Sequence, residues 1–100
     1  ISMKLTPIVY ETVAKSQTGQ VLGTTGAQGD YLTRLIIVPE TTGAGTVALL
    51  DGVTSMNVFV TGTLSNLTPI VIEFGMPSAT GAWSLTTGDN VHVIAVGAFT

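Results

Sequence analysis

Apolar and polar residues alternate with a period of two along several short segments of this 100-residue chain. The clearest case is segment 91–99, in which every second residue falls on one face: Val91, Val93, Ala95, Gly97 and Phe99. A second short apolar run, Ala82–Leu85, precedes it, and the Gly-Asp-Asn sequence 88–90 supplies the positive-φ positions that a tight loop needs. This C-terminal stretch therefore predicts a β-hairpin in an all-β protein.

The strongest central strand is expected at Tyr31–Val38, which is rich in β-branched and aromatic residues and ends where Pro39 cannot continue a ladder. Strict alternation divides its residues between two faces: Leu32, Arg34, Ile36 and Val38 on one, and Tyr31, Thr33, Leu35 and Ile37 on the other. Both faces are apolar toward the C-terminal end of the strand. We therefore expect this end to be buried on both sides.

Further strands are expected on both sides of this one, at Leu5–Tyr10 (extended by Thr12–Ala14), Thr46–Leu50, Ser55–Val60 and Pro69–Phe74. Pro7 favours an edge position for the first of them, and Asp51-Gly52 between two apolar runs is a strong hairpin signal. No segment keeps a helical period over ten residues. The sequence predicts a small antiparallel β-sandwich, jelly-roll-like, with seven or eight strands.

The chain is long enough for one domain. Within it, we expect residues 1–29 to form an N-terminal arm, or a first strand plus a long polar loop, and residues 30–100 to form the sandwich core. The segment Ser16–Gly29 is rich in Gly, Thr and Gln. An unstructured loop of this length is unusual inside a compact domain and is often functional.

Charged side chains are scarce, at 9% of residues against about 25% in an ordinary soluble domain. The three bases, Lys4, Lys15 and Arg34, are far apart in the sequence, and the net charge is −3. Nucleic-acid binding needs several cations facing phosphates, so we exclude it. We also expect no membrane contact, since the chain has no polybasic amphipathic segment and no apolar run near the ~18 residues of a spanning helix.

A surface so poor in charge has weak electrostatic protection against association. We therefore expect part of it to be buried against other subunits. The chain has no cysteine, which excludes disulfides and thiolate metal sites and fits assembly in a cytoplasm.

The sequence lacks the combinations of residues that catalysis requires. His92 is the only histidine, no activated serine accompanies it, and nearby Asp89 belongs to a turn, so we expect a surface or interface histidine. Asp51 and Asp89 are explained as turn formers. Asp30 either pairs with Arg34 or caps the strand that follows, and mid-strand Glu73 either faces solvent or pairs with Arg34 across an interface. We expect no enzyme activity and no cofactor, because the one histidine has no partner, cysteine is absent and the acids are dispersed. We also expect no metal site, and the sequence has no D-x-D-x-D run of the kind that binds calcium.

Three aromatic residues leave two interpretations open. Trp83, Tyr10 and Tyr31 could form a platform on which a sugar stacks. The interpretation that we favour for Trp83 is structural: a large aromatic side chain closes one end of the core, as is common in small β-domains.

Three stretches carry a resemblance to a known family: Tyr31–Pro39 (YLTRLIIVP), Gly45–Val60, and the closing Gly81–Thr100 (GAWSLTTGDNVHVIAVGAFT). Together they resemble the small β-sandwich decoration and head-fibre proteins of tailed bacteriophages. Those proteins often carry a strand ending in I-x-P, then a hairpin, then a closing G-A-W…T-T-G-x-N-V-x-V-I-A-V-G. The resemblance covers residues 31–100.

The resemblance implies a structural virion protein that decorates and stabilises the outside of a bacteriophage capsid. It implies a homotrimer at local three-fold positions that bridges subunits of the major capsid protein, on a virion assembled in the host cytoplasm. Under this reading the candidate interface residues are Lys4, Lys15, Arg34, Glu73 and His92. The segment Ile1–Gly29, which carries two of the three bases, is expected to touch the shell or a neighbouring subunit.

The alternative function is a carbohydrate- or receptor-binding β-sandwich module of a phage fibre. In that case Tyr31 and Trp83 are the candidate ligand-stacking residues, and both must offer an exposed ring face. A small hydrolase is a third reading, which requires His92 to lie close to a nucleophile.

Overall fold

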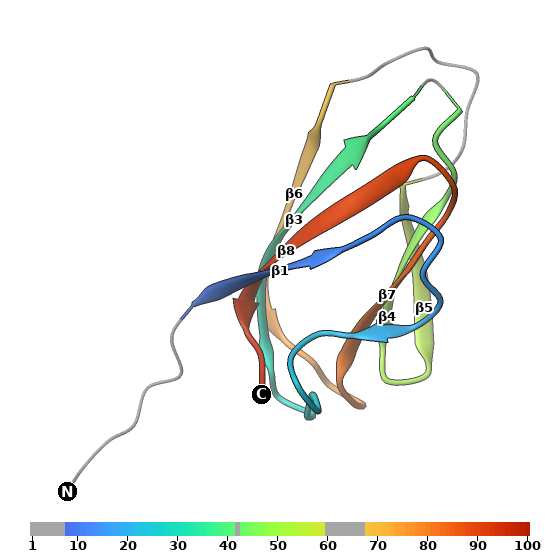
Figure 1. Cartoon of the computed structure of the whole chain (residues 1–100). Helices are drawn as coiled ribbons and strands as arrows, with labels where there is room; N and C mark the ends of the chain where they lie inside the picture. The colour runs from blue at the N-terminus through green and yellow to red at the C-terminus, as the bar shows by residue number, and fades with distance from the viewer. Residues whose placement is uncertain (1–7, 42, 60–67) are drawn as a thin grey trace, which may run out of the picture.

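The computed structural model describes residues 8–41, 43–59 and 68–100. In these residues the protein is all-β, with eight strands in two four-stranded antiparallel sheets that pack face to face (Figure 1). The predicted fold class, an all-β sandwich of seven or eight strands, is confirmed. None of the described residues forms a helix long and apolar enough to cross a membrane.

The first sheet, called sheet A here, contains in spatial order β1 (Val9–Val13), β8 (Val91–Ala98), β3 (Tyr31–Pro39) and β6 (Ile70–Pro77). The second, sheet B, contains β2 (Gln20–Val21), β7 (Trp83–Thr87), β4 (Val47–Asp51) and β5 (Thr54–Phe59). Each sheet therefore has two central strands and two edge strands.

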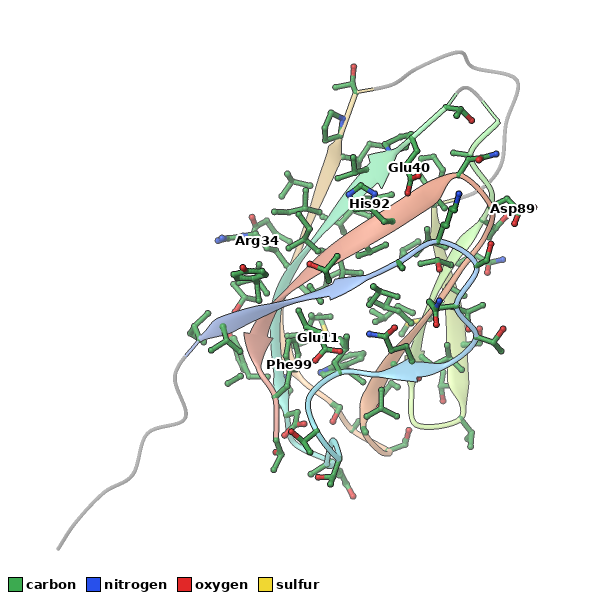
Figure 2. All side chains as sticks on the ribbon, in the orientation of Figure 1. Glu11, Arg34, Glu40, Asp89, His92 and Phe99 are labelled. Carbon is green, nitrogen blue, oxygen red and sulfur yellow. The ribbon has the colours of Figure 1, made fainter. Side chains whose placement is uncertain are left out.

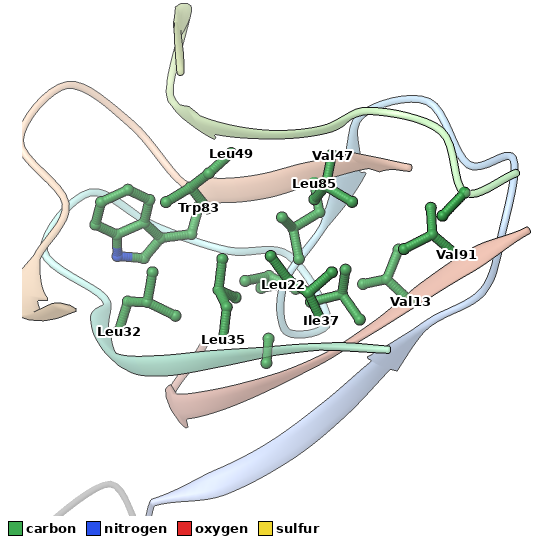
Figure 3. Close-up of a cluster of buried hydrophobic side chains, with 13 residues drawn as sticks. Val13, Leu22, Leu32, Leu35, Ile37, Val47, Leu49, Trp83, Leu85 and Val91 are labelled. Carbon is green, nitrogen blue, oxygen red and sulfur yellow. The ribbon is translucent and has the colours of Figure 1, made fainter. Parts of the chain in front are cut away.

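The core is the layer of apolar side chains between the two sheets (Figure 3). Its fully buried members are Val13, Leu22, Leu32, Leu35, Ile37, Val47, Leu49, Leu85, Val91, Val93 and Ala95. Ala44 and Trp83 complete the cluster, with at most 8% of either exposed. Each large side chain contributes about 1.5–3 kcal/mol by leaving water, so this layer is the main source of stability.

The β3 strand departs from the strict alternation that the sequence predicts. Leu32, Leu35 and Ile37 all point into the core, because the register shifts between Leu32 and Arg34 in the pairing with both neighbours. The prediction that Leu32 shares a face with Ile36 and Val38 is therefore wrong: Leu32 faces the core, and the other two residues face outward. On β6 the shift coincides with Gly75 at φ +62°, a conformation that glycine adopts without strain. β6 therefore continues to Pro77, three residues beyond the predicted end of this strand at Phe74.

The predicted C-terminal hairpin is also wrong. β7 lies in sheet B and β8 in sheet A, and the turn at residues 88–90 carries the chain from one sheet to the other. Trp83 and Leu85 on β7 face Val91 and Val93 on β8 through the core, whereas a flat hairpin would set all four on one face of a single sheet. Asn90 at φ +59° accommodates the turn.

The other predicted hairpin is confirmed. β4 pairs with β5 from Val47↔Phe59 to Asp51↔Thr54, which leaves a two-residue turn of Gly52 and Val53. Gly52 has φ +61°, as the first central residue of a type II′ turn requires.

Residues 8–29 contribute to both sheets. β1 is an edge strand of sheet A, β2 is an edge strand of sheet B, and Leu22 just after β2 is fully buried. Glu11 on β1 joins the two layers: its carboxylate accepts hydrogen bonds from the Gly23 main-chain N–H at 2.8 Å and from the Gln20 amide at 3.2 Å. The described part of the predicted arm is thus a strand and a polar loop bound to the core; Leu5–Pro7 of the predicted first strand lie outside the described residues.

Candidate interaction face

The side chains of sheet A that point away from the core form a surface that we call the outer face of sheet A. Its members alternate with core positions on all four strands: Tyr10, Thr12, Tyr31, Arg34, Ile36, Val38, Val71, Glu73, His92, Ile94, Val96 and Ala98. Most of them are aliphatic or aromatic. When both alternating sets of side chains on a strand are apolar, a two-sheet sandwich can bury only one set in its core, and the other set is left on the outer face of the sheet.

Register brings these residues into rows across the sheet. Thr12, Ile94, Ile36 and Val71 form the central row, from β1 through β8 and β3 to β6. Tyr10, Val96, Arg34 and Glu73 form the next row in the same strand order. At the edges of the sheet, Tyr10 is 72% exposed and Val71 is 54% exposed. The apolar residues are therefore contiguous across the face.

The outer face of sheet B has a different chemistry. Its central strands present Ala48, Leu50, Ser84 and Thr86, and the edge strand β5 adds Ser55 and Asn57. Small and hydroxyl-bearing side chains thus make up much of this side, and the apolar residues on it are Leu50 and Val21, the latter on the edge strand β2 opposite Ser84 and 39% exposed. Soluble monomers rarely expose a large contiguous apolar patch, and one rimmed by polar groups marks an interaction surface. Among the described residues, the outer face of sheet A carries more contiguous apolar side chains than the outer face of sheet B.

Arg34 and Glu73 form an ion pair on the outer face of sheet A. The Arg34 Nε atom lies 3.0 Å from Glu73 Oε1, and the two side chains are 41% and 65% exposed. Figure 2 shows Arg34 pointing away from the sandwich. Glu73 thus faces solvent, as the first of its two alternatives has it, and its pair with Arg34 joins adjacent strands of one chain; the expected pair across an interface is not what the structure contains.

His92 has a carboxylate partner in Glu40, which follows β3. The distance from His92 Nδ1 to Glu40 Oε2 is 3.0 Å, and both side chains are about one-third exposed (Figure 2). They line a shallow hollow of about 350 Å³, whose other walls are Thr12, Ala14 and Lys15. Lys15 therefore lies at the same end of the face as His92. Among the described residues no cluster of three or more His, Asp or Glu side chains could hold a metal ion.

The remaining candidates lie elsewhere. Lys4 is outside the described residues. Tyr31 is 40% exposed at the other end of the outer face of sheet A. Trp83 is 2% exposed, and its indole N–H donates to the Asp30 main-chain oxygen at 2.8 Å. Trp83 is a core residue with no ring face free for a sugar.

Asp30, which is 8% exposed, organises the end of the sandwich beside Trp83. Its carboxylate accepts hydrogen bonds from the main-chain N–H groups of Ala27 and Thr100, each at 3.0 Å, and from the Thr100 hydroxyl. We expected Asp30 either to pair with Arg34 or to cap the start of β3. Instead, its carboxylate joins the loop at Ala27 to the C-terminal residue Thr100, and Arg34 takes no part. The role of Asp30 is structural.

Sequence reasoning missed the apolar rows and Glu40. The signal for the rows was present in the apolar character of both faces of segment 31–38, which we interpreted as burial on both sides. Glu40 gave no signal, because it is 52 positions from His92 and only the β3–β8 register brings them together.

Comparisons of the chain with family models, with curated proteins and with solved structures found no match.

Proposed function

We propose that this protein is a structural virion protein that decorates the outside of a bacteriophage capsid and stabilises it by bridging major capsid subunits as a homotrimer. In this role it carries out no catalysis and needs no cofactor. The observation that carries the proposal is the apolar outer face of sheet A on a domain in which only 9% of residues are charged. The resemblance of residues 31–100 to phage decoration proteins supplies the location on the virion.

The physical argument starts from the cost of that face in water. Leaving contiguous aliphatic rows exposed forgoes about 25 cal/mol for each Å² that a partner could cover. A protein present in many copies on a symmetric shell repeats each contact, so weak contacts add up to firm attachment. An apolar face of this kind is useful to a protein that is bound into such a shell, whereas in a free monomer it is only a cost.

The charged groups lie toward one edge and one end of the face, with Glu73 on the edge strand β6 and Arg34 beside it on β3. The pair Arg34–Glu73 lies in one row of the face, and Lys15, Glu40 and His92 lie around the hollow at its other end. Partly exposed charges at a rim orient a partner more than they raise affinity. Four of the five interface candidates, all except Lys4, belong to these two groups.

A second candidate, a carbohydrate- or receptor-binding module of a phage fibre, is favoured by the exposed Tyr10 and Tyr31 on the same outer face. Burial of Trp83 weakens it, because the largest aromatic surface of the chain takes no part. Titration of the protein with oligosaccharides, followed by tyrosine fluorescence, tests it: a saturable change that Tyr10→Ala abolishes supports this candidate.

The leading proposal is tested on particles of the phage that encodes the chain, prepared with and without its gene. We expect many copies on the outer surface by cryo-electron microscopy, loss of that density without the gene, and its return when purified protein is added. Particles without the protein should rupture at lower temperature. Val71→Glu is expected to rebind less well, and the matched control Ser55→Glu, which adds the same charge to the edge of sheet B, is expected to rebind normally. Absence from purified particles, or presence only in fibres, would overturn the proposal.

A further inference from the structure

The two sides of the sandwich are closed to different degrees. By strand order, the edge strands β1 and β2 lie on one side and the edge strands β5 and β6 lie on the other. On the β1–β2 side the core residues Val13 and Leu22 are fully buried, and the Glu11 carboxylate joins the two sheets through Gly23 and Gln20. The chain itself therefore seals this side of the core.

The β5–β6 side leaves inward side chains partly uncovered. Met56 on β5, and Ile70 and Met76 on β6, are each paired in register with a fully buried core residue of the neighbouring strand. Residues that are paired across two strands point to the same face of the sheet, so these three side chains point toward the core layer. Nevertheless Met56 is 39% exposed, Ile70 37% and Met76 45%. A partner that covered this side would remove their apolar surface from water.

The edge strands also differ in how they discourage pairing with a foreign strand. β2 is only two residues long, β1 carries Glu11, and β6 carries Glu73, a register shift beside Gly75 and a proline at Pro77. Short length, charge, bulges and proline are the features by which edge strands avoid extra pairing. β5 has six residues without charge or proline, and its pairing with β4 is unbroken as far as Asn57. Among the described edge strands, β5 is therefore the one most open to a further strand.

The free edge of β5 determines the kind of partner that fits it. In the described part of the chain β5 lies at the margin of sheet B and pairs only with β4, so its other edge presents main-chain N–H and C=O groups that a further strand can bond (Figure 1). A helix satisfies its own main-chain groups along its length and cannot supply these bonds.

The side chains beside this edge narrow the partner further. β5 has no charged residue, and the inward residues of β6 are apolar, so a charged segment would lose water there without gaining an ion pair. In strand addition the main chain supplies hydrogen bonds, and alternate side chains face the surface that is covered. The edge therefore fits an extended, uncharged segment with apolar residues at alternate positions.

From these observations we infer that the free edge of β5 is a docking site for an extended strand of another protein, which adds one strand to sheet B and covers the exposed inward side chains of the β5–β6 side. The inference goes beyond the proposed function, because the proposed capsid contact is the outer face of sheet A. It rests on that function in one respect. Two copies paired through β5 would form an isologous contact, which closes at two copies, whereas the proposed assembly has three.

The first experiment measures main-chain amide exchange of the full chain by NMR, with and without an added peptide. The probe is a short peptide in which valine alternates with threonine, with a lysine at each end for solubility. We expect it to slow the exchange of the β5 amides that are not bonded to β4 by about tenfold or more, and to leave the amides of β6 unchanged. The same peptide methylated on its main-chain nitrogens keeps the side chains but loses the donors, and it should give no protection.

The matched variants move one positive charge within the β4–β5 hairpin. Met56→Lys places it on the free edge, where an inward charge discourages strand addition, and should weaken peptide binding by about tenfold or more. Val53→Lys places the same charge in the turn, at a residue that is 93% exposed, and should bind as the wild type does. Asn57→Lys, at an exposed outward position on β5, repeats the edge test without changing an inward residue. Circular dichroism and Trp83 fluorescence verify that each variant is folded.

The inference is overturned when the alternating peptide leaves β5 unprotected, when the methylated peptide protects it equally, or when both edge variants bind the peptide as the wild type does. Edge amides of β5 that already exchange slowly in dilute protein would mean that the chain covers its own edge. Protection that grows with protein concentration alone would mean that a second copy is the occupant. Either result would also overturn the inference.

The two proposals fail separately. Met56→Lys should rebind phage particles normally while it loses the peptide, because the proposed capsid contact lies on the other sheet. A protein that binds the peptide through β5 but is missing from phage particles would refute the capsid function alone.

Discussion

The indole nitrogen of Trp83 donates a hydrogen bond of 2.8 Å to the main-chain oxygen of Asp30, and this bond ties the first residue of β7 in sheet B to the loop that enters β3 in sheet A. The Asp30 carboxylate in turn binds the main-chain N–H groups of Ala27 and Thr100. A single buried ring therefore closes one end of the core and fixes two chain segments beside it.

Replacing Trp83 should lower stability in two separable steps. Trp83→Ala removes a buried ring and leaves a cavity, with an expected loss of about 3–5 kcal/mol in the free energy of unfolding. Trp83→Phe keeps most of the ring but removes the indole N–H. Its cost should be smaller, because the Asp30 oxygen retains the hydrogen bond from the Ser78 N–H at 2.9 Å. Urea unfolding followed by circular dichroism measures both. A Trp83→Ala protein as stable as the wild type would contradict the structural role of this residue.

Gly97 should tolerate no side chain. A Cβ atom at this position would lie 2.2 Å from the main-chain oxygen of Tyr31, which the β3–β8 pairing holds in place. Gly97→Ala is therefore expected to lose about 1–3 kcal/mol or more, as overpacked sites do. Gly43→Ala is the control, since its new Cβ would be 3.7 Å from the nearest atom. Thermal unfolding of the two variants compares them, and an equal effect would show that the close approach at Gly97 relaxes freely.

Period-two alternation was enough to predict the class of fold, because each strand must turn one set of side chains to the core whatever its neighbours are. The β4–β5 hairpin followed from Asp51-Gly52, a local signal whose partners are adjacent in the chain. The β7–β8 connection was missed because alternation reports which residues point inward and not which sheet they belong to. The bulge in β3 was missed because Gly75, the residue that accompanies it, lies on a strand far away in the sequence.

The candidate face was only partly predictable for a similar reason. Arg34 and Glu73 are 39 positions apart, and the sequence suggested their pairing only across an interface and not between adjacent strands. The row of Ile94, Ile36 and Val71 comes from three separate segments. Composition indicated that some surface should be buried in an assembly. Strand order and register were needed to say which one.

Asp51 should make stability depend on pH in the acid range. The Thr80 main-chain N–H is the largest cause that holds the pKa of the Asp51 carboxyl below its ordinary value, and the Ala79 N–H and the Thr80 hydroxyl add to it. A carboxyl whose pKa is lower in the folded state stabilises the fold above its unfolded-state pKa of about 3.9. That contribution is lost as the pH falls through this value and then through the folded-state pKa.

The matching variant is Asp51→Asn, which cannot ionise. It should be less stable than the wild type at pH 7, and the difference in urea midpoint should shrink between about pH 5 and pH 2, as the wild-type carboxyl takes up its proton. Urea titrations at a series of pH values measure this difference. A constant gap across the series would mean that the carboxylate charge plays no part in holding residues 79 and 80.

The Arg34–Glu73 pair should give two different coupling energies, depending on what covers it. In a dilute, monomeric protein its side chains are 41% and 65% exposed, so water and salt screen the attraction and a double-mutant cycle on unfolding should yield less than about 1 kcal/mol. The cycle uses Arg34→Ala, Glu73→Ala and the double variant. If other copies cover the outer face of sheet A, the same cycle measured on trimer dissociation should give a larger coupling that is less sensitive to salt, because the pair is then partly withdrawn from water. Equal and small coupling energies in both measurements would mean that the pair stays in solvent and is not part of the interface between copies.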